Sequence, residues 1–429
     1  MNPITRRRFL LVAGGATVAG CAGTRAAAPP STSTSPSTTR PSPGGGADLP
    51  TPTVVTTTTV PSALVSDDRV LVVVELNGGN DAINTLPPTT GTYHDLRPTL
   101  ALADDVLVDA GFGGHALHPS LAPMVPLLDA GALAVVAGIG WEDPDRSHFA
   151  SMDRWFRADR VNEPYGWLGR WLDSLDTDIG ALGAVALGSN NELLTGAQRG
   201  GTLITAADAF RLPPGLSNSD LRALTEPISA DPSIAAAQRA FAEAIGAVAE
   251  FDPIADAVRA VAPSDPDGYG PVDGPFSTGL AVAAELILAD ADTRVVSVSG
   301  SGFDTHADQL DTHADLLGDL AGGLVAFWAT LEAAGQADRV LLVTTSEFGR
   351  RAVENGSGGC DHGAGGVSFA LGRAVAPGLH GAIELNDLLD GDLRPIFDPR
   401  SMFTGCLDWL GGDVEKILGD RYEDFGLLA

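Results

Sequence analysis

The sequence predicts an α/β protein with a mostly parallel sheet that carries helices on both of its faces. From residue 69 onward, short apolar runs rich in valine alternate with longer stretches of helical periodicity, an order typical of a parallel α/β sheet. The runs are apolar at nearly every position, as expected of strands that are covered on both faces. Carboxylates and imidazoles follow several of the runs, and such sheets bind ligands at the carboxyl ends of their strands.

The strands are predicted from these apolar runs in chain order. The first covers residues 69–76 and ends in a turn from Asn77 to Asp81, whose two glycines let the backbone approach another segment closely. Further strands are predicted at 132–137, 184–187, 294–298, 340–345 and 367–371.

Helices are predicted between and after the strands. The first begins near Pro119, because proline is favoured in the first turn of a helix. The predicted helices cover 117–130, 149–155, 167–175, 232–251, 276–291, 311–334 and 401–410. The stretch 188–274 is less regular and is predicted to be an insertion or cap that includes a loop from about residue 263.

The N-terminal residues are predicted to be an export signal. Adjacent arginines at positions 6–8 precede Phe9, Leu10 and a short apolar stretch, the pattern of a twin-arginine (Tat) signal peptide. That stretch, residues 10–19, is shorter than a membrane-spanning helix requires. Small residues before Cys21 resemble the lipobox of bacterial lipoproteins, so residues 1–21 are predicted to be a Tat signal peptide with lipidation at Cys21. The alternative is an ordinary Tat signal, with Cys21 in the discarded peptide.

Residues 22–66 are predicted to be a disordered tether, because this Pro/Ser/Thr-rich segment has too few large apolar side chains to form a core. Residues 67–429 are predicted to form the α/β domain. We therefore expect export by the Tat machinery and a place on the outer face of the cell membrane or in the cell envelope, with secretion as the alternative. The lipid anchor is the only membrane contact that the sequence predicts.

Charge and cysteine content narrow the possible partners. The chain has 55 acidic and 26 basic residues, a formal net charge of −29, so no nucleic-acid partner is expected. Besides Cys21 the chain contains Cys360 and Cys406, which are able to pair in an oxidising compartment. Their sequence positions do not decide whether they do.

Three short polar clusters hold most of the candidate chemistry: 302–306, 346–350 and 359–363. Asp304, His306 and His362 are predicted to be metal ligands, because a carboxylate with imidazoles suits zinc, manganese or iron better than calcium. Three protein ligands with one open position are typical of a catalytic zinc site. Glu347 is predicted to be a catalytic base or fourth ligand, and Arg350 is predicted to neutralise an anionic substrate group.

Each cluster also has a structural interpretation. The structural alternative for Asp304 and His306 is a cap for a helix that starts near Asp308, and for Glu347 with Arg350 it is an ion pair at the end of a strand. The other structural interpretations are a turn at 361–362, a helix start at 146–148 and a helix cap at Asp81.

Several motifs in a fixed order resemble a known family. They read "VVVELNGGNDAIN", "RSHF", "GFDTHADQ", "SEFGRRAVENGSGGCDHG" and "LRPIFDPRSMF". The chain resembles, over about residues 68–412, the bacterial exported family catalogued as domain of unknown function 1501. That family is placed in the alkaline phosphatase/sulfatase-like superfamily, so the resemblance implies an alkaline-phosphatase-like α/β core.

The resemblance also implies roles for individual residues. Asp304, His306 and His362 match ligands of one metal site, while Phe348 stands where the superfamily has a histidine ligand of a second metal. Asp81 is the carboxylate available near the first strand and is predicted to be a further ligand. Ser147 occupies the nucleophile position. His148 beside it has no direct counterpart in the superfamily. Independently of the resemblance, Arg146 and His148, which flank Ser147, are predicted to bind substrate.

Two functions remain open at this stage. The first is a metal-dependent hydrolase that acts on a phosphate or sulfate ester, either a small molecule or a polymer, with zinc as the expected metal and manganese or iron as alternatives. The second is a non-catalytic cell-surface protein that binds a polymer or a partner on a degenerate form of the same fold.

Overall fold

The computed structural model describes residues 68–160, 162–205, 229–261, 274–289 and 292–429. The predicted signal peptide, with Cys21, and the predicted tether lie outside the described residues. So do most of the loop predicted from residue 263 and part of the predicted insertion.

The described residues form an eight-stranded sheet of order β4-β3-β5-β1-β6-β7-β2-β8. Central β1 (Val70–Asn77) is parallel to β5 (Val295–Ser301) on one side and to β6 (Val340–Thr345) on the other. Only β7 (Gly366–Leu371) among these eight runs antiparallel to its neighbours, β6 and β2 (Leu133–Ile139). The other strands are β3 (Ala184–Leu187), β4 (Thr202–Ile204) and β8 (Gly378–Gly381), and β9 (Leu388–Leu389) with β10 (Asp392–Leu393) forms a separate pair. The predicted mostly parallel sheet is confirmed.

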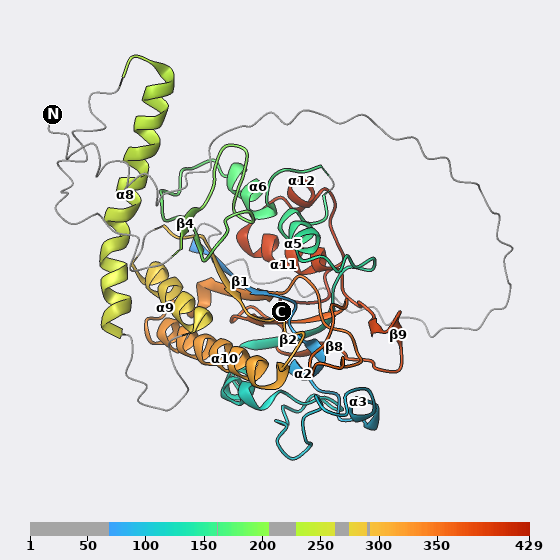
Figure 1. Ribbon diagram of the computed structural model, residues 1–429. Coiled ribbons are helices and arrows are strands. Elements are labelled where there is room, and N and C mark those ends of the chain that lie inside the picture. Colours follow the sequence, from blue (N-terminus) through green and yellow to red (C-terminus); the bar gives the residue numbers. More distant parts are fainter. Residues whose placement is uncertain (1–67, 161, 206–228, 262–273, 290–291) are drawn as a thin grey trace, which may run out of the picture. The chain divides into compact units, whose positions relative to one another are not determined.

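Helices cover both faces of the sheet (Figure 1). Val72 and Val74 of β1 contribute to a core with α9 (Pro275–Leu288) and α10 (Gln309–Ala333). The alternate residues Leu71 and Val73 contribute to the opposite core, since successive side chains of a strand point to opposite faces. That second core includes α5 (His148–Arg157), α6 (Trp167–Asp173), α11 (Pro399–Leu410) and α12 (Val414–Leu418). The remaining elements are α2 (Ala82–Thr85), α3 (Gly91–Leu96), η2 (Pro119–Met124), α4 (Val125–Asp129), α8 (Pro232–Val261) and η3 (Ala337–Arg339).

Helix boundaries differ from the predictions mainly where prolines occur. The helix predicted at 117–130 is divided into the 3-10 helix η2 and the short helix α4, because proline lacks the N–H that continues an α-helix. The helix predicted at 232–251 continues as α8 to Val261, past Pro253. By length and composition α10 is the one helix among the described residues that is able to cross a membrane. Four of its leucines, Leu317, Leu320, Leu324 and Leu331, are instead buried in the core.

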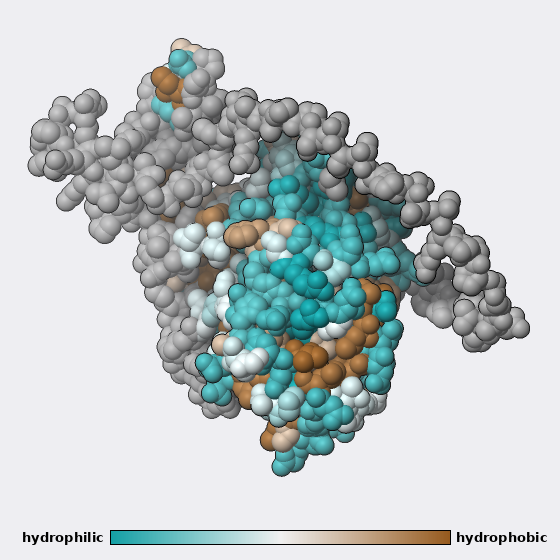
Figure 2. Space-filling view, turned by 45° about the vertical axis from the view of Figure 1, so that its right-hand side comes forward, coloured by the Kyte–Doolittle hydropathy of each residue, from teal (hydrophilic) through white to brown (hydrophobic). Residues whose placement is uncertain are grey.

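One face of the described part of the chain is mostly hydrophilic (Figure 2), and its two cysteines are unpaired. On the face shown in Figure 2 hydrophilic residues predominate, with a smaller apolar patch. Cys360 and Cys406 are both buried as free thiols, so the disulfide that the sequence left open is not formed.

Glu75 is a titratable group inside the sheet, only 3% exposed. Burial, opposed by hydrogen bonds from Ser297 and Asn190, raises its pKa from 4.5 to about 7. The stability that this group contributes is therefore fully present below pH 4.5 and is lost as the pH rises through 7. We expect Glu75→Gln to remove about 2–3 kcal/mol of the change in unfolding free energy between about pH 5 and pH 8. Denaturant unfolding of metal-free protein measures this, and an unchanged pH dependence would contradict it.

Candidate metal centre

The three polar clusters meet at one edge of the sheet. Since β1, β5 and β6 are parallel, their carboxyl ends lie at the same edge, and the antiparallel β7 begins there. The loops after β5 and β6 carry Asp304 and Glu347, and the loop before β7 carries His362. The segment after β2 leads to His148 at the start of α5. Three segments far apart in the sequence, after β2, after β5 and between β6 and β7, therefore deliver polar side chains to one place.

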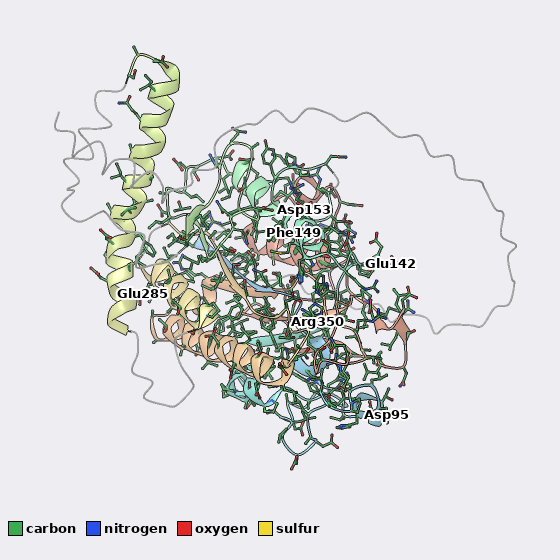
Figure 3. All side chains as sticks on the ribbon, in the orientation of Figure 1. Asp95, Glu142, Phe149, Asp153, Glu285 and Arg350 are labelled. Carbon is green, nitrogen blue, oxygen red and sulfur yellow. The ribbon has the colours of Figure 1, made fainter. Side chains whose placement is uncertain are left out.

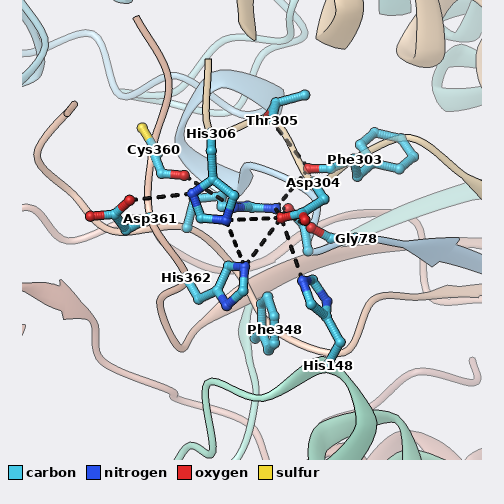
Figure 4. Close-up of polar contacts among 12 residues, drawn as sticks. Gly78, His148, Phe303, Asp304, Thr305, His306, Phe348, Cys360, Asp361 and His362 are labelled. Carbon is cyan, nitrogen blue, oxygen red and sulfur yellow. Dashed lines mark hydrogen bonds and ion pairs between the residues drawn. The ribbon is translucent and has the colours of Figure 1, made fainter. Parts of the chain in front are cut away.

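Three imidazoles and one carboxylate face a common point (Figure 4). The Nε2 atoms of His306 and His362 are 2.9 Å apart, and Asp304 Oδ1 lies 3.1 Å from each of them. His148 Nε2 lies 3.4 Å from the same carboxylate oxygen. The structure thus brings together the three predicted ligands and adds His148, which sequence reasoning assigned to substrate binding.

The other ring nitrogen of each histidine faces an acceptor. His148 Nδ1 is 2.7 Å from Glu347 Oε1, His362 Nδ1 is 2.7 Å from the Arg146 carbonyl oxygen, and His306 Nδ1 is 3.3 Å from Asp361 Oδ1. A hydrogen on each Nδ1 leaves the Nε2 lone pairs directed at the common point. This is how the histidine ligands of metal ions are commonly held.

The donor set fits a divalent transition metal. Ligand atoms about 2.0–2.1 Å from a tetrahedral ion stand roughly 3.3 Å apart, close to the separations found here. His148 Nε2 is buried and has no hydrogen-bond partner among the described residues, as expected of a nitrogen atom that coordinates a metal ion. The side chains of Asp304 and His306 are 50% and 44% exposed, so water and substrate are able to reach the point. Nitrogen ligands favour zinc, manganese or iron over calcium.

Electrostatics support the same arrangement. Burial tends to raise the pKa of Asp304, but the hydrogen bond and charge of the Arg350 guanidinium help to outweigh it, and the pKa is lowered to about 2. The hydrogen bond to Glu347 raises the pKa of His148. Glu347 is itself buried and accepts a hydrogen bond from the Gly78 N–H at 2.9 Å. Glu347 therefore lies behind His148 as its fixed partner.

Phe348 packs against the imidazoles and supplies no ligand atom. Its ring centroid is 4.9 Å from that of His148 and 4.7 Å from that of His362. Gly79 makes room for the ring: it has φ +78°, and a Cβ there would stand 2.5 Å from the Phe348 ring. Phe348 thus forms an apolar wall beside the two imidazoles.

Arg350 does not bind substrate in this arrangement. Its side chain is completely buried and lies among other side chains (Figure 3). It donates to Asp304 Oδ1 at 2.8 Å and pairs with that residue, not with Glu347. Its other hydrogen bonds go to the carbonyl oxygens of Gly78, Gly79, Phe303 and Cys360. Arg350 instead ties three loops together and fixes Asp304.

Arg146 and Ser147 occupy less direct positions than the sequence suggested. The Arg146 guanidinium forms an ion pair with the buried carboxylate of Asp392, so it is not free for an anionic substrate. Ser147 is exposed at the N-cap position before α5, and its hydroxyl caps no helix N–H. It remains next to His148 and is available to solvent.

Asp81 does not fit the role of a metal ligand, because both of its carboxylate oxygens are occupied. Oδ1 accepts hydrogen bonds from Ile83 N and Arg97, and Oδ2 accepts from Arg97 and Gln309. Asp81 is the N-cap of α2 and the partner of a buried arginine. The helix-cap interpretation is the one that the structure bears out. Asp304 and His306 do not cap α10, whose N-cap residue is Asp308.

Sequence reasoning did not identify His148 as a candidate ligand and did not identify Arg97 at all. For His148 a signal was present, since the predicted strand 132–137 is followed by a loop that ends at this residue. Arg97 follows no predicted strand, and its role appears only when its partners are located.

The family and the structural similarities follow from comparison with known proteins. The family model "Protein of unknown function (DUF1501)" matches residues 134–419, and no curated protein matches the chain. Similar solved structures include a protein of the alkaline phosphatase superfamily from Vibrio parahaemolyticus. The two sequences are 9% identical, the match covers 82% of this chain and 69% of that chain, and the TM-score is 0.35. The sulfatase PsFucS1 from Pseudoalteromonas sp. gives 10% identity, coverages of 84% and 73%, and a TM-score of 0.36. A phosphonate monoester hydrolase from Silicibacter pomeroyi gives 11% identity, coverages of 83% and 78%, and a TM-score of 0.35. At these TM-scores the similarities carry no argument about activity.

Proposed function

The chain belongs to the DUF1501 family of proteins of unknown function, and from this premise we propose that it is an exported, lipid-anchored, metal-dependent hydrolase of phosphate or sulfate esters. The observation that carries the proposal is the convergence of three Nε2 atoms and the Asp304 carboxylate on one accessible point. The export signal and the lipid anchor on Cys21 rest on the N-terminal sequence.

The residues around the point have separable roles. Asp304, His148, His306 and His362 would hold one zinc, manganese or iron ion, which when bound supplies Lewis-acid activation of water and of the ester. Glu347 keeps the proton of His148 on Nδ1. Arg350 fixes the Asp304 oxygen through its hydrogen bond.

Two further features bear on the mechanism. Ser147 is the exposed hydroxyl beside the centre and the candidate nucleophile. The apolar ring of Phe348 lines the side of the centre against which His148 and His362 pack, so water and substrate would approach from the side of the exposed Asp304 and His306.

The proposal needs one metal ion. Among the described residues a single group has mutual metal-binding spacing, namely His148, Asp304 and His362; His306 Nε2 adjoins it, 2.9 Å from His362 Nε2. Asn77, near the end of β1, donates its side-chain amide to Ser299 Oγ at 2.7 Å, and Phe348 has no ligand atom. The second metal of the superfamily therefore has no complete ligand set in this part of the chain.

Elemental analysis of the purified full-length chain tests the proposal. We expect about one equivalent of zinc, manganese or iron per chain, and loss of this metal in His362→Ala. His380→Ala is a matched control, since His380 Nε2 contacts the Ala376 carbonyl oxygen and not the centre. The metal-loaded protein should also hydrolyse an aryl sulfate or aryl phosphate.

Three outcomes are informative. Absence of metal in the wild type, or equal metal in wild type and His362→Ala, would sink the proposal. Bound metal without hydrolysis of either ester would favour the non-catalytic binding protein.

A further inference from the structure

A buried polar network connects the metal centre to a part of the protein that holds none of its ligands. Its outer end is Arg97, which is completely buried. Two guanidinium nitrogens of Arg97 donate to the two carboxylate oxygens of Asp81, at 2.5 and 3.0 Å. Its remaining hydrogen bonds go to Asn84 Oδ1 and to the carbonyl oxygens of Arg351 and Ala352. Each of the five guanidinium donors thus has an acceptor.

The network continues from Asp81 through Gln309 to Thr305. Gln309, the first residue of α10, is fully buried. Its side-chain amide donates to Asp81 Oδ2 at 2.5 Å, and its carbonyl oxygen accepts from Thr305 Oγ1 at 3.1 Å. Thr305 lies between Asp304 and His306, two of the residues that face the common point (Figure 4). The Thr305 backbone carbonyl also accepts from Cys360 N, at 3.3 Å, so the same residue contacts the loop of His362.

We propose that Gln309 is a positioning residue of the metal centre, which holds the loop of Asp304 and His306 at its ligating geometry through Thr305 and is itself oriented by the Arg97–Asp81 ion pair. This inference rests on the proposed metal centre. Gln309 is fully buried, and its side chain contacts Thr305 and Asp81 and not the common point. Its effect is on the affinity of the site for metal.

The chemistry at this position requires an amide. Gln309 must donate to a carboxylate on one side and accept from a hydroxyl on the other. A glutamate would place a second negative charge against Asp81, and an apolar side chain would leave both neighbours without that partner. Unpaired polar groups are costly in a buried site, so the side chains that lose a partner are expected to shift. Thr305 lies next to Asp304 and His306, so a shift of Thr305 would displace these ligands.

The test is metal affinity of purified full-length Gln309→Met, measured by competition with a chelator for Zn²⁺. We expect roughly a 10–100-fold weaker affinity than in the wild type, the range found when outer partners of metal ligands are lost. Thr305→Val should weaken affinity similarly. Combining the two changes should add little, since both remove the same hydrogen bond. Gln336→Met, just beyond the far end of α10, is the control, because Gln336 accepts a hydrogen bond from Arg339 and does not contact the network.

The outcomes separate this inference from the proposed function. Tight zinc binding by the wild type and equal binding by Gln309→Met would overturn the positioning role and leave the metal centre intact. A lower melting temperature of the metal-free variant without loss of zinc affinity would likewise show a purely structural role. No zinc, manganese or iron binding by the wild type would overturn both.

Discussion

His148→Ala is expected to lower metal affinity by more than about 100-fold, because it removes a ligand and not merely an outer partner of one, whose loss costs 10–100-fold. His148 Nε2 is buried, has no hydrogen-bond partner among the described residues and lies 3.4 Å from Asp304 Oδ1. Its Nδ1 is held by Glu347 at 2.7 Å. Chelator competition with the purified chain measures the affinity, and ester hydrolysis should fall with it.

The control for this change is the neighbouring residue. Phe149 is 89% exposed, so Phe149→Ala alters the same turn of α5 without touching the metal centre and should leave metal affinity unchanged. If His148→Ala binds zinc as tightly as the wild type, the ligand set reduces to Asp304, His306 and His362. His148 would then be left as a substrate contact, the role that the sequence first suggested.

The sequence predicts those site residues whose position depends on where they stand relative to the strands. Asp304, Glu347 and His362 belong to clusters beside apolar runs, and a parallel sheet brings the carboxyl ends of its strands to one edge. The convergence of Asp304 and Glu347 therefore follows from periodicity and topology alone, whereas His362 joins them because β7 runs antiparallel and begins at this edge. The family motifs added the expectation of metal ligands, and Phe348 already indicated that one ligand of a second metal is missing.

The residues whose roles changed are those defined by long-range partners. The sequence does not show that Arg350 is enclosed by carbonyl oxygens of residues 78, 79, 303 and 360. Nor does it show that the charge of Asp392 is directed at Arg146. An arginine near a candidate site looks the same in sequence whether it is exposed to substrate or buried. Burial is decided by packing among segments that lie far apart in the chain.

Arg97→Met is expected to lower the free energy of unfolding by about 3–5 kcal/mol, because it leaves the buried carboxylate of Asp81 without its counter-charge. Both side chains of the pair are 0% exposed, so solvent screening does not weaken their interaction. Denaturant unfolding of the metal-free chain measures the loss. Arg373→Met is the contrasting change: its ion pair with Glu332 is 49% and 39% exposed, and it should cost less than about 1 kcal/mol.

The same pair predicts the sign of a pH effect. Burial tends to raise the pKa of Asp81, but the charge and hydrogen bonds of Arg97 outweigh it and lower that pKa below its ordinary value of 3.8. The stability from this pair is therefore present above that value and is lost as the pH falls through the lowered pKa of the folded state. The difference in unfolding free energy between wild type and Arg97→Met should accordingly narrow in acid. Asp81→Asn added to Arg97→Met should restore part of the loss at neutral pH, because it removes the unpaired charge. A double variant no more stable than Arg97→Met would mean that lost packing, and not the stranded carboxylate, accounts for the cost.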